Sequence, residues 1–101
     1  MSKTYEVKVS QVARDQMYSH VLFLSNVSED ASSTLKESFV EGLKSLEKYP
    51  ERFSFYENFA LPLDRYRKMP IFPCYLVLYE VTNKVVYVDD IIDTRQKNIK
   101  F

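Results

Sequence analysis

Two neighbouring apolar runs dominate the C-terminal third of the chain. Residues 75–82 and residues 84–92 are rich in β-branched and aromatic side chains, and the turn Thr82-Asn83-Lys84 separates them. Asn tolerates the positive φ angle that a tight hairpin turn requires. The pattern therefore predicts a β-hairpin.

Alternation along the strands divides this hairpin into two faces if its loop has two residues. One predicted face holds Tyr75, Val77, Tyr79, Val81, Val86, Val88 and Ile92. The other holds Leu76, Leu78, Val85, Tyr87 and Ile91. Because both faces are apolar, the hairpin is expected in the middle of a sheet, covered on both sides.

Two stretches with helical periodicity precede the hairpin. Ser10 and Ser28 are suited to cap helix N-termini, and Pro50 is expected to stop the second helix. Apolar residues recur at helical spacing at Ala13, Met17, Val21, Leu24 and Val27, and again at Ala31, Leu35, Phe39, Leu43 and Leu46. We expect two antiparallel amphipathic helices, joined by a short turn, that cover one face of the sheet.

The remaining segments complete a small sheet. Residues 5–9 alternate as a half-buried first strand does, and the basic residues 65–69 are expected to form a short second strand. Residues 50–64 lack a period but are rich in aromatics, so they are expected to pack along the sheet edge. The order is then β-α-α-β-β-β: one α+β domain over residues 1–101, with both helices on one face of a four-stranded, mainly antiparallel sheet.

Composition narrows the function classes. The formal net charge is +0, whereas proteins that bind RNA or ribosomes usually carry a basic excess. The single cysteine, Cys74, excludes an internal disulfide and suits a reducing cytoplasm. No apolar run approaches the roughly 20 residues of a membrane span, and the N-terminus lacks the apolar core of a signal peptide. We therefore expect a cytoplasmic protein with no membrane partner.

The chain resembles the RelE/ParE superfamily of bacterial toxins. The resemblance rests on the order of elements, the Y-R-K at residues 66–68, the strand Y-L-V-L-Y-E-V at residues 75–81, and the ending V-Y-V-D-D-I-I-D-T-R-Q at residues 86–96. These toxins belong to type II toxin–antitoxin modules and are also known as plasmid stabilisation proteins. The resemblance implies a growth inhibitor neutralised by an antitoxin whose extended, partly helical tail wraps the toxin. Members either cut mRNA in the ribosomal A site, as RelE-like toxins do, or poison DNA gyrase, as ParE-like toxins do.

Two basic positions of the RelE-like ribonucleases have counterparts here. The arginine after their last strand falls on Arg95, where it would stabilise charge on the scissile phosphate. A basic residue of their second strand falls on Arg67, with Arg65 and Lys68 beside it. The resemblance thus implies a target-binding or phosphate-binding role for these four side chains, and a catalytic one for Arg95 and Arg67 if the protein is a nuclease.

Two other positions depart from the ribonuclease pattern. The arginine that those enzymes place on the third strand falls on Leu76, and the tyrosine near their C-terminus falls on Phe101. Phe101 is still expected to contact the target, because phenylalanine can stack on a base, but it cannot move a proton. These departures and the neutral charge favour a ParE-like toxin that binds DNA gyrase. A ribosome-dependent mRNA endoribonuclease, and a decayed toxin that retains only antitoxin binding, stay as alternatives.

The same charged residues also have structural interpretations. Arg95 can pair with Asp93, Asp89 or Asp90 as an ordinary solvated arginine. Arg67 and its neighbours can protect an exposed edge strand from aggregation. Asp89 and Asp90 are expected to pair with Arg67 or Arg95.

No metal or cofactor site is expected. Asp89 and Asp90 have no clustered ligands nearby, and the only histidine, His20, is distant in sequence. Cys74 and His20 lack the third, orienting group of a nucleophilic site, and both suit structural roles.

The sheet face away from the helices is the expected partner surface. Two helices on one side cannot shield Leu76, Leu78, Tyr87 and Ile91 on the other, and a large exposed apolar patch usually marks an interaction site. An antitoxin helix or strand is expected to dock there, which gives a toxin–antitoxin hetero-oligomer. Two alternatives are that the aromatic residues 53–63 fold back over this face, or that the chain forms a homodimer through it.

Overall fold

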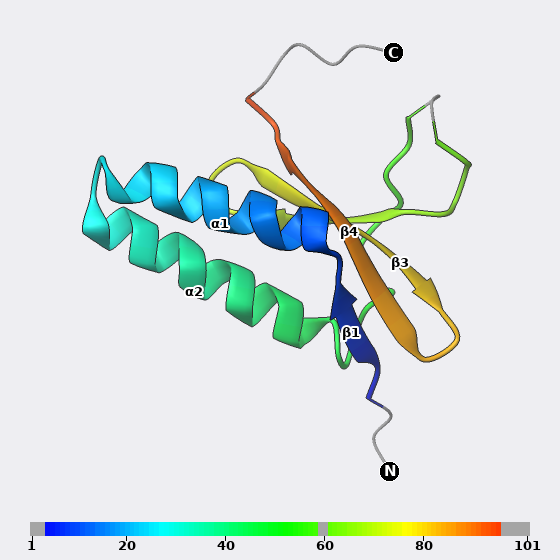
Figure 1. Cartoon of the computed structure of the whole chain (residues 1–101). Coiled ribbons are helices and arrows are strands. Elements are labelled where there is room, and N and C mark those ends of the chain that lie inside the picture. The colour runs from blue at the N-terminus through cyan, green and yellow to red at the C-terminus, as the bar shows by residue number, and fades with distance from the viewer. Residues whose placement is uncertain (1–3, 59–60, 96–101) are drawn as a thin grey trace.

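The computed structural model describes residues 4–58 and 61–95. The predicted order of elements is confirmed (Figure 1). The elements are β1 (Glu6–Val9), α1 (Gln11–Ser25), α2 (Glu29–Ser45), β2 (Arg67–Ile71), β3 (Tyr75–Thr82) and β4 (Val85–Asp93).

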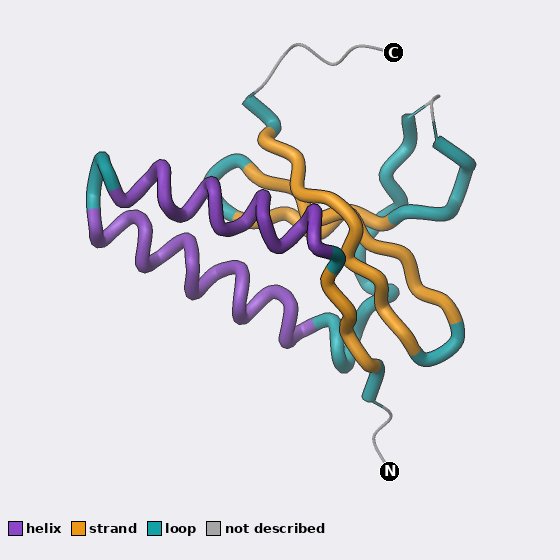
Figure 2. Tube along the Cα trace, in the orientation of Figure 1, coloured by secondary structure: helices purple, strands orange, loops and turns teal. Residues whose placement is uncertain are grey.

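The four strands form one mixed sheet in the order β1-β4-β3-β2. Figure 2 shows the strands lying together beside the two helices. β4 pairs parallel with β1 and antiparallel with β3, and β3 pairs antiparallel with β2. The two helices lie side by side and cover one face of this sheet (Figure 1). The expected α+β architecture, with helices on one side of a mainly antiparallel sheet, is therefore confirmed.

The predicted two-residue hairpin turn is present between β3 and β4. Thr82 faces Val85 across the pair, and Asn83 adopts a φ angle of 58°. β2 begins and ends two residues later than expected, at Arg67 and Ile71. The loop before it pairs along its outer edge, through the bonds from Tyr56 N to Tyr66 O and from Lys68 N to Ser54 O. Pro70 is tolerated within β2 because β2 is an edge strand.

Both predicted helix caps are formed, but the second helix ends earlier than expected. The Oγ atoms of Ser10 and Ser28 each accept a backbone N–H three residues on, at 3.0 Å and 3.1 Å. α2 ends at Ser45 rather than against Pro50. After Ser45 the backbone N–H groups bond to carbonyls mostly three residues earlier instead of four. The carbonyl of Glu47 accepts the N–H of Tyr5, which links this turn to the start of β1.

A β-bulge at Asp89 reverses the alternation along β4. Leu78 faces Asp90 and Tyr79 faces Val88, so Asp89 is an extra residue with no counterpart on β3. Ile91 therefore points towards the helices, where it is 4% exposed, and Ile92 points to the opposite face. The predicted faces of these two isoleucines were wrong, because uninterrupted alternation does not allow for an inserted residue.

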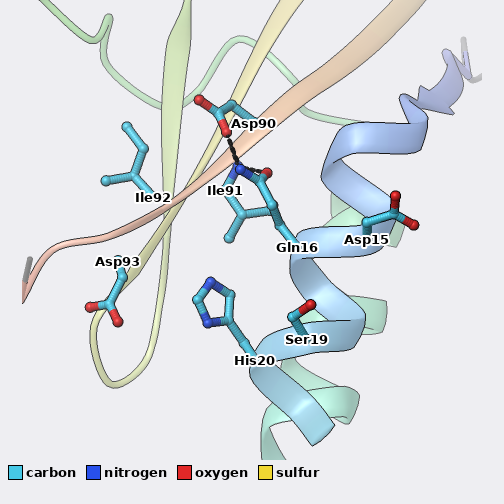
Figure 3. A pocket seen from close by; sticks show the side chains of 8 residues that line it. All are labelled: Asp15, Gln16, Ser19, His20, Asp90, Ile91, Ile92 and Asp93. Carbon is cyan, nitrogen blue, oxygen red and sulfur yellow. Dashed lines mark hydrogen bonds between the residues drawn. The ribbon is translucent and has the colours of Figure 1, made fainter. Parts of the chain in front are cut away.

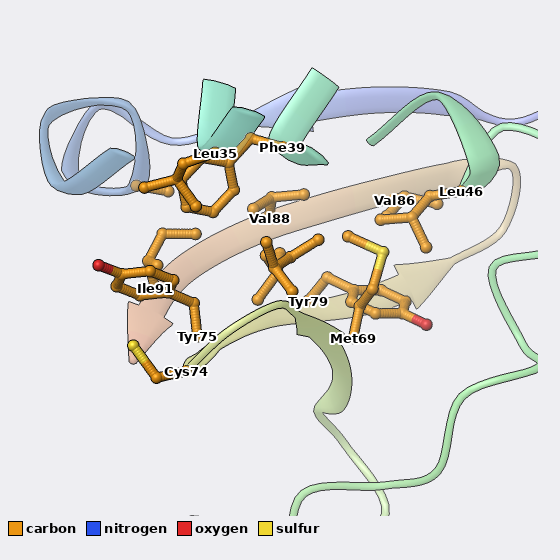
Figure 4. Packing of buried hydrophobic residues seen from close by; sticks show 13 residues of the cluster. Leu35, Phe39, Leu46, Met69, Cys74, Tyr75, Tyr79, Val86, Val88 and Ile91 are labelled. Carbon is orange, nitrogen blue, oxygen red and sulfur yellow. The ribbon is translucent and has the colours of Figure 1, made fainter. Parts of the chain in front are cut away.

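The core lies between the helices and the sheet (Figure 4). Leu35 and Phe39 of α2 point from above onto the sheet, where Val88 of β4 and Tyr79 of β3 lie. Tyr79 is fully buried, and its hydroxyl donates a 2.5 Å hydrogen bond to the carbonyl of Pro50. Burial raises the pKa of Tyr79 to about 12, so this donor stays protonated at neutral pH.

Replacing Tyr79 with Phe should destabilise the fold. The variant leaves the buried carbonyl of Pro50 without this donor, which should lower the free energy of unfolding by about 1–2 kcal/mol. Urea denaturation measures the change, and Tyr49→Phe, at an exposed position, is the matched control with no expected effect. Equal stability of Tyr79→Phe and wild type would contradict the assigned role of this bond.

Candidate functional site

A groove of about 480 Å³ lies between α1 and the second half of β4 (Figure 3). It exists because β1 pairs with β4 only as far as Val88, so that α1 is the next neighbour of β4 beyond that point. Its walls are formed by Asp15, Gln16, Ser19 and His20 of α1 and by Asp90, Ile91, Ile92 and Asp93 of β4.

Gln16 takes the place of a neighbouring strand along this part of β4. Its Oε1 accepts the backbone N–H of Ile91 at 2.8 Å, and its Nε2 donates to Asp90 Oδ1 at 2.7 Å (Figure 3). The same carboxylate oxygen also accepts the N–H of Ile91 at 3.0 Å. Sequence reasoning missed Gln16, although it is a polar residue directly before Met17 of the apolar stripe.

Asp93 and Arg95 form a two-pronged ion pair where β4 ends. Arg95 Nη2 lies 3.0 Å from Asp93 Oδ2, and Arg95 Nε donates to Asp93 Oδ1 at 3.2 Å. The hydrogen bonds from Arg95 lower the pKa of Asp93 to about 2. The Asp93 side chain is 10% exposed, whereas that of Arg95 is 65% exposed. The structure thus shows the Asp93 pairing that the sequence offered as one interpretation of Arg95, while most of the guanidinium still faces solvent.

His20 lines the groove, whereas Cys74 is buried in the core. The rings of His20 and Tyr75 lie 4.6 Å apart between centroids, and burial is the main cause that lowers the pKa of His20. Burial likewise raises the pKa of the Cys74 thiol. A neutral imidazole and a protonated thiol fit the structural roles that the sequence suggested.

Arg67 serves to hold a loop. Its Nη1 donates to the carbonyls of Phe53 at 2.7 Å and Glu51 at 3.2 Å, and its guanidinium lies 4.1 Å from the centroid of the Phe55 ring. The expected pairing of Asp89 or Asp90 with Arg67 or Arg95 was wrong. Asp90 is instead bonded by Gln16.

The other basic candidates lie apart from Arg95. Arg65 pairs with Glu80 at 3.1 Å, and Lys68 lies half-buried opposite Leu78.

The register shows how far Arg67 is from the groove. Arg67 of β2 pairs with Tyr79 of β3, and Asp93 of β4 pairs with Tyr75 of β3. Tyr75 and Tyr79 are four residues apart, so Arg67 and Asp93 are separated by about 13 Å along β3. Arg67 and Lys68 also point to opposite faces, because they are successive strand residues. The structure therefore does not gather the predicted phosphate-binding residues into one site, and Phe101 lies outside the described residues.

The sheet face away from the helices is only partly covered by the chain itself. Leu78 is 4% exposed and lines a cavity of about 190 Å³ together with Leu61 and Tyr66, so residues before β2 cover it. The part of this face that solvent can reach is formed by Tyr87, which is 38% exposed, and by the half-buried Leu76. Of the four predicted partner residues, Ile91 lies in the core and Leu78 beneath the chain's own loop.

Other site types have no support within residues 4–58 and 61–95. No group of three His, Cys, Asp or Glu side chains in these ranges could hold a metal ion. Nor does any described helix have the length and apolar character needed to cross a membrane.

Comparison with known proteins places the chain by its fold. No family model matches the chain, and no curated protein matches it. Among solved structures it is similar to a chain of "Chromosomal ParDE TA system from P. aeruginosa", with a TM-score of 0.66 and 14% sequence identity. The similarity covers 90% of this chain and 97% of that one. The chain is thus an α+β protein with a RelE/ParE-like fold, as its sequence resemblance implied.

Replacing Asp93 with Asn should make the free energy of unfolding less dependent on pH in the acidic range. The lowered pKa of Asp93 means that its stabilising effect is present above about pH 4 and is lost as the pH falls towards about 2. We expect the variant to be less stable than wild type by about 1 kcal/mol at pH 7, since the exposed Arg95 is screened by solvent. The difference should shrink as the pH falls through about 2 and vanish below it. Denaturation at several pH values measures this, with Glu57→Gln as an exposed control. A difference that does not change with pH would contradict the ion-pair assignment.

Proposed function

We propose that the chain is the toxin of a bacterial type II toxin–antitoxin module and acts in the cytoplasm. In this proposal it inhibits growth by binding a macromolecular target, DNA gyrase, as ParE-like toxins do, and a cognate antitoxin neutralises it. The observation that carries the proposal is the RelE/ParE-like fold, shared over nearly the whole chain with a protein of a ParDE system.

The separation of the basic residues favours binding over RNA cleavage. A ribonuclease needs several charged groups converging on one phosphate and a group that can move a proton. Here Arg67 is bonded to loop carbonyls and Arg65 to Glu80, and Leu76 replaces the third-strand arginine. The Arg95 side chain, next to the groove residue Asp93, is 65% exposed. We therefore assign Arg95 to target contact.

Partner binding is assigned to the accessible part of the open sheet face. Tyr87 and Leu76 are apolar or amphipathic, lie on adjacent strands and have no helix above them. Covering them would remove exposed apolar surface from water. The antitoxin is proposed to dock here.

Induced expression in a bacterial host should arrest growth by damaging DNA. We expect accumulated DNA breaks with intact mRNA, because the chain would act on gyrase and not on transcripts. Transcript mapping and a DNA-break assay on the same cultures provide the readouts. Codon-periodic mRNA cleavage would instead establish the endoribonuclease, and absence of toxicity would establish a decayed toxin.

Two variants make this experiment specific. Arg95→Ala should be less toxic while still folded, since loss of a charge-assisted contact weakens target binding roughly tenfold to a hundredfold. Lys36→Ala, at an exposed position of α2, is the control. Toxicity equal to wild type in a folded Arg95→Ala protein would remove Arg95 from the target site.

Replacing Tyr87 with Asp should weaken antitoxin binding without unfolding the domain. A carboxylate on the open face would have to be desolvated when the partner docks, which should raise the dissociation constant at least tenfold. The measurement is titration with the cognate antitoxin of the proposed module. Val40→Asp, an apolar-to-acid change on the outside of α2, is the control. Unchanged binding by folded Tyr87→Asp would mean that the antitoxin docks elsewhere.

A further inference from the structure

The outer side of α1 carries a second apolar surface, separate from the core. Tyr18, Leu22, Phe23 and Val27, here named the α1 outer patch, are 51–72% exposed. Tyr18 and Leu22 are four residues apart and therefore adjacent on α1. Phe23 follows Leu22 directly, and Val27 lies in the turn after the helix. The core-facing positions of α1 are a different set: Ala13, Met17, Val21 and Leu24.

The α1 outer patch is unusual for the surface of this protein because it has no charge. Between Gln16 and Val27 the chain has no Lys, Arg, Asp or Glu, and the only histidine faces the groove beside β4. Most of the outer face of α2 is charged by comparison. The surface depression along α2 is lined by the charged residues Lys36, Glu37, Glu41 and Lys44, together with Ser33 and Val40. A helix that is apolar on both its inner and outer sides is normally buried on both.

The size of the patch suits a contact between two proteins. An aromatic side chain accounts for about 150–250 Å² when buried, so four largely exposed apolar side chains present roughly 400–500 Å². If two such patches face each other, the total surface that they bury, together with their polar borders, approaches roughly 1,200 Å². This is the lower end of the range for specific protein–protein interfaces.

The lack of charge indicates which partner the patch fits. In a twofold-symmetric contact each residue near the axis meets its own copy, so a charged residue there would repel itself. An uncharged, apolar centre avoids this repulsion. We propose that two copies of the chain associate through the α1 outer patch, with their α1 helices antiparallel and Leu22 near the twofold axis.

The two ends of the patch carry charge, in contrast to its centre. Arg14 and Asp15 precede the patch on α1, and Glu29 and Asp30 begin α2 just after it. Because the helices cover the opposite side of the sheet from Tyr87, such a dimer leaves the open face accessible to a partner.

Sedimentation velocity on the purified full chain tests the dimer. Wild type is expected to sediment at twice the chain mass at high micromolar concentration. Leu22→Glu should sediment as a folded monomer, because each copy would place its new carboxylate against the other. Val40→Glu, on the outside of α2, is the matched control and should stay dimeric. A monomeric wild type, or a dimeric Leu22→Glu protein, would overturn the proposal.

Disulfide cross-linking locates the axis independently of charge. Leu22→Cys should form a covalent dimer under mild oxidation, because residues at the axis face their own copies closely enough to bridge. Val40→Cys should not, and the native Cys74 is buried and adds little background. Failure of Leu22→Cys to cross-link faster than Val40→Cys would place the contact elsewhere and contradict the proposal. The prediction is independent of gyrase or antitoxin binding, so it can fail while the toxin assignment holds.

Discussion

The bulge at Asp89 is the constraint on which the rest of the architecture depends. Before it, β4 has β1 on one side and β3 on the other; after it, α1 replaces β1. The inserted residue turns Ile91 into the core and lets Gln16 of α1 satisfy the backbone that β1 leaves unpaired. The groove between α1 and β4 follows from this replacement, since a helix cannot approach a strand as closely as another strand does. The pair Asp93–Arg95 then stands at the end of this groove.

The same geometry is the reason for proposing a target-binding toxin in preference to an RNA-cleaving one. Arg67 and Arg95 belong to positions that are well separated along the sheet, and each already has a structural partner within the chain. The neutral overall charge gives no broad attraction for a polyanion. Exposed apolar or amphipathic surface lies at Tyr87 on the sheet and at the α1 outer patch on the helices. Both kinds of surface are typical of contacts with proteins.

Most of the fold could be predicted from local chemistry. Ser10 and Ser28 as caps, the helical stripes, and Asn83 in the turn each act over a few residues, so the sequence pattern reports them directly. The bulge could not be placed in this way, because it is set by packing of β4 against both β3 and α1. Its one local signal was the unusual pair Asp89-Asp90 within an apolar strand. The candidate site was predicted less well for the same reason: the partners of Arg67 are loop carbonyls, which no side-chain pattern reveals.

Incubating the purified protein with ribosomes programmed with a defined mRNA tests the central claim most directly. The claim is that separated, already paired basic residues cannot assemble a phosphate-cleaving site. The account predicts that the mRNA stays intact at every codon in the ribosomal A site, with a known A-site ribonuclease as the positive control. Cleavage of the mRNA that Arg67→Ala and Arg95→Ala each abolish would contradict it.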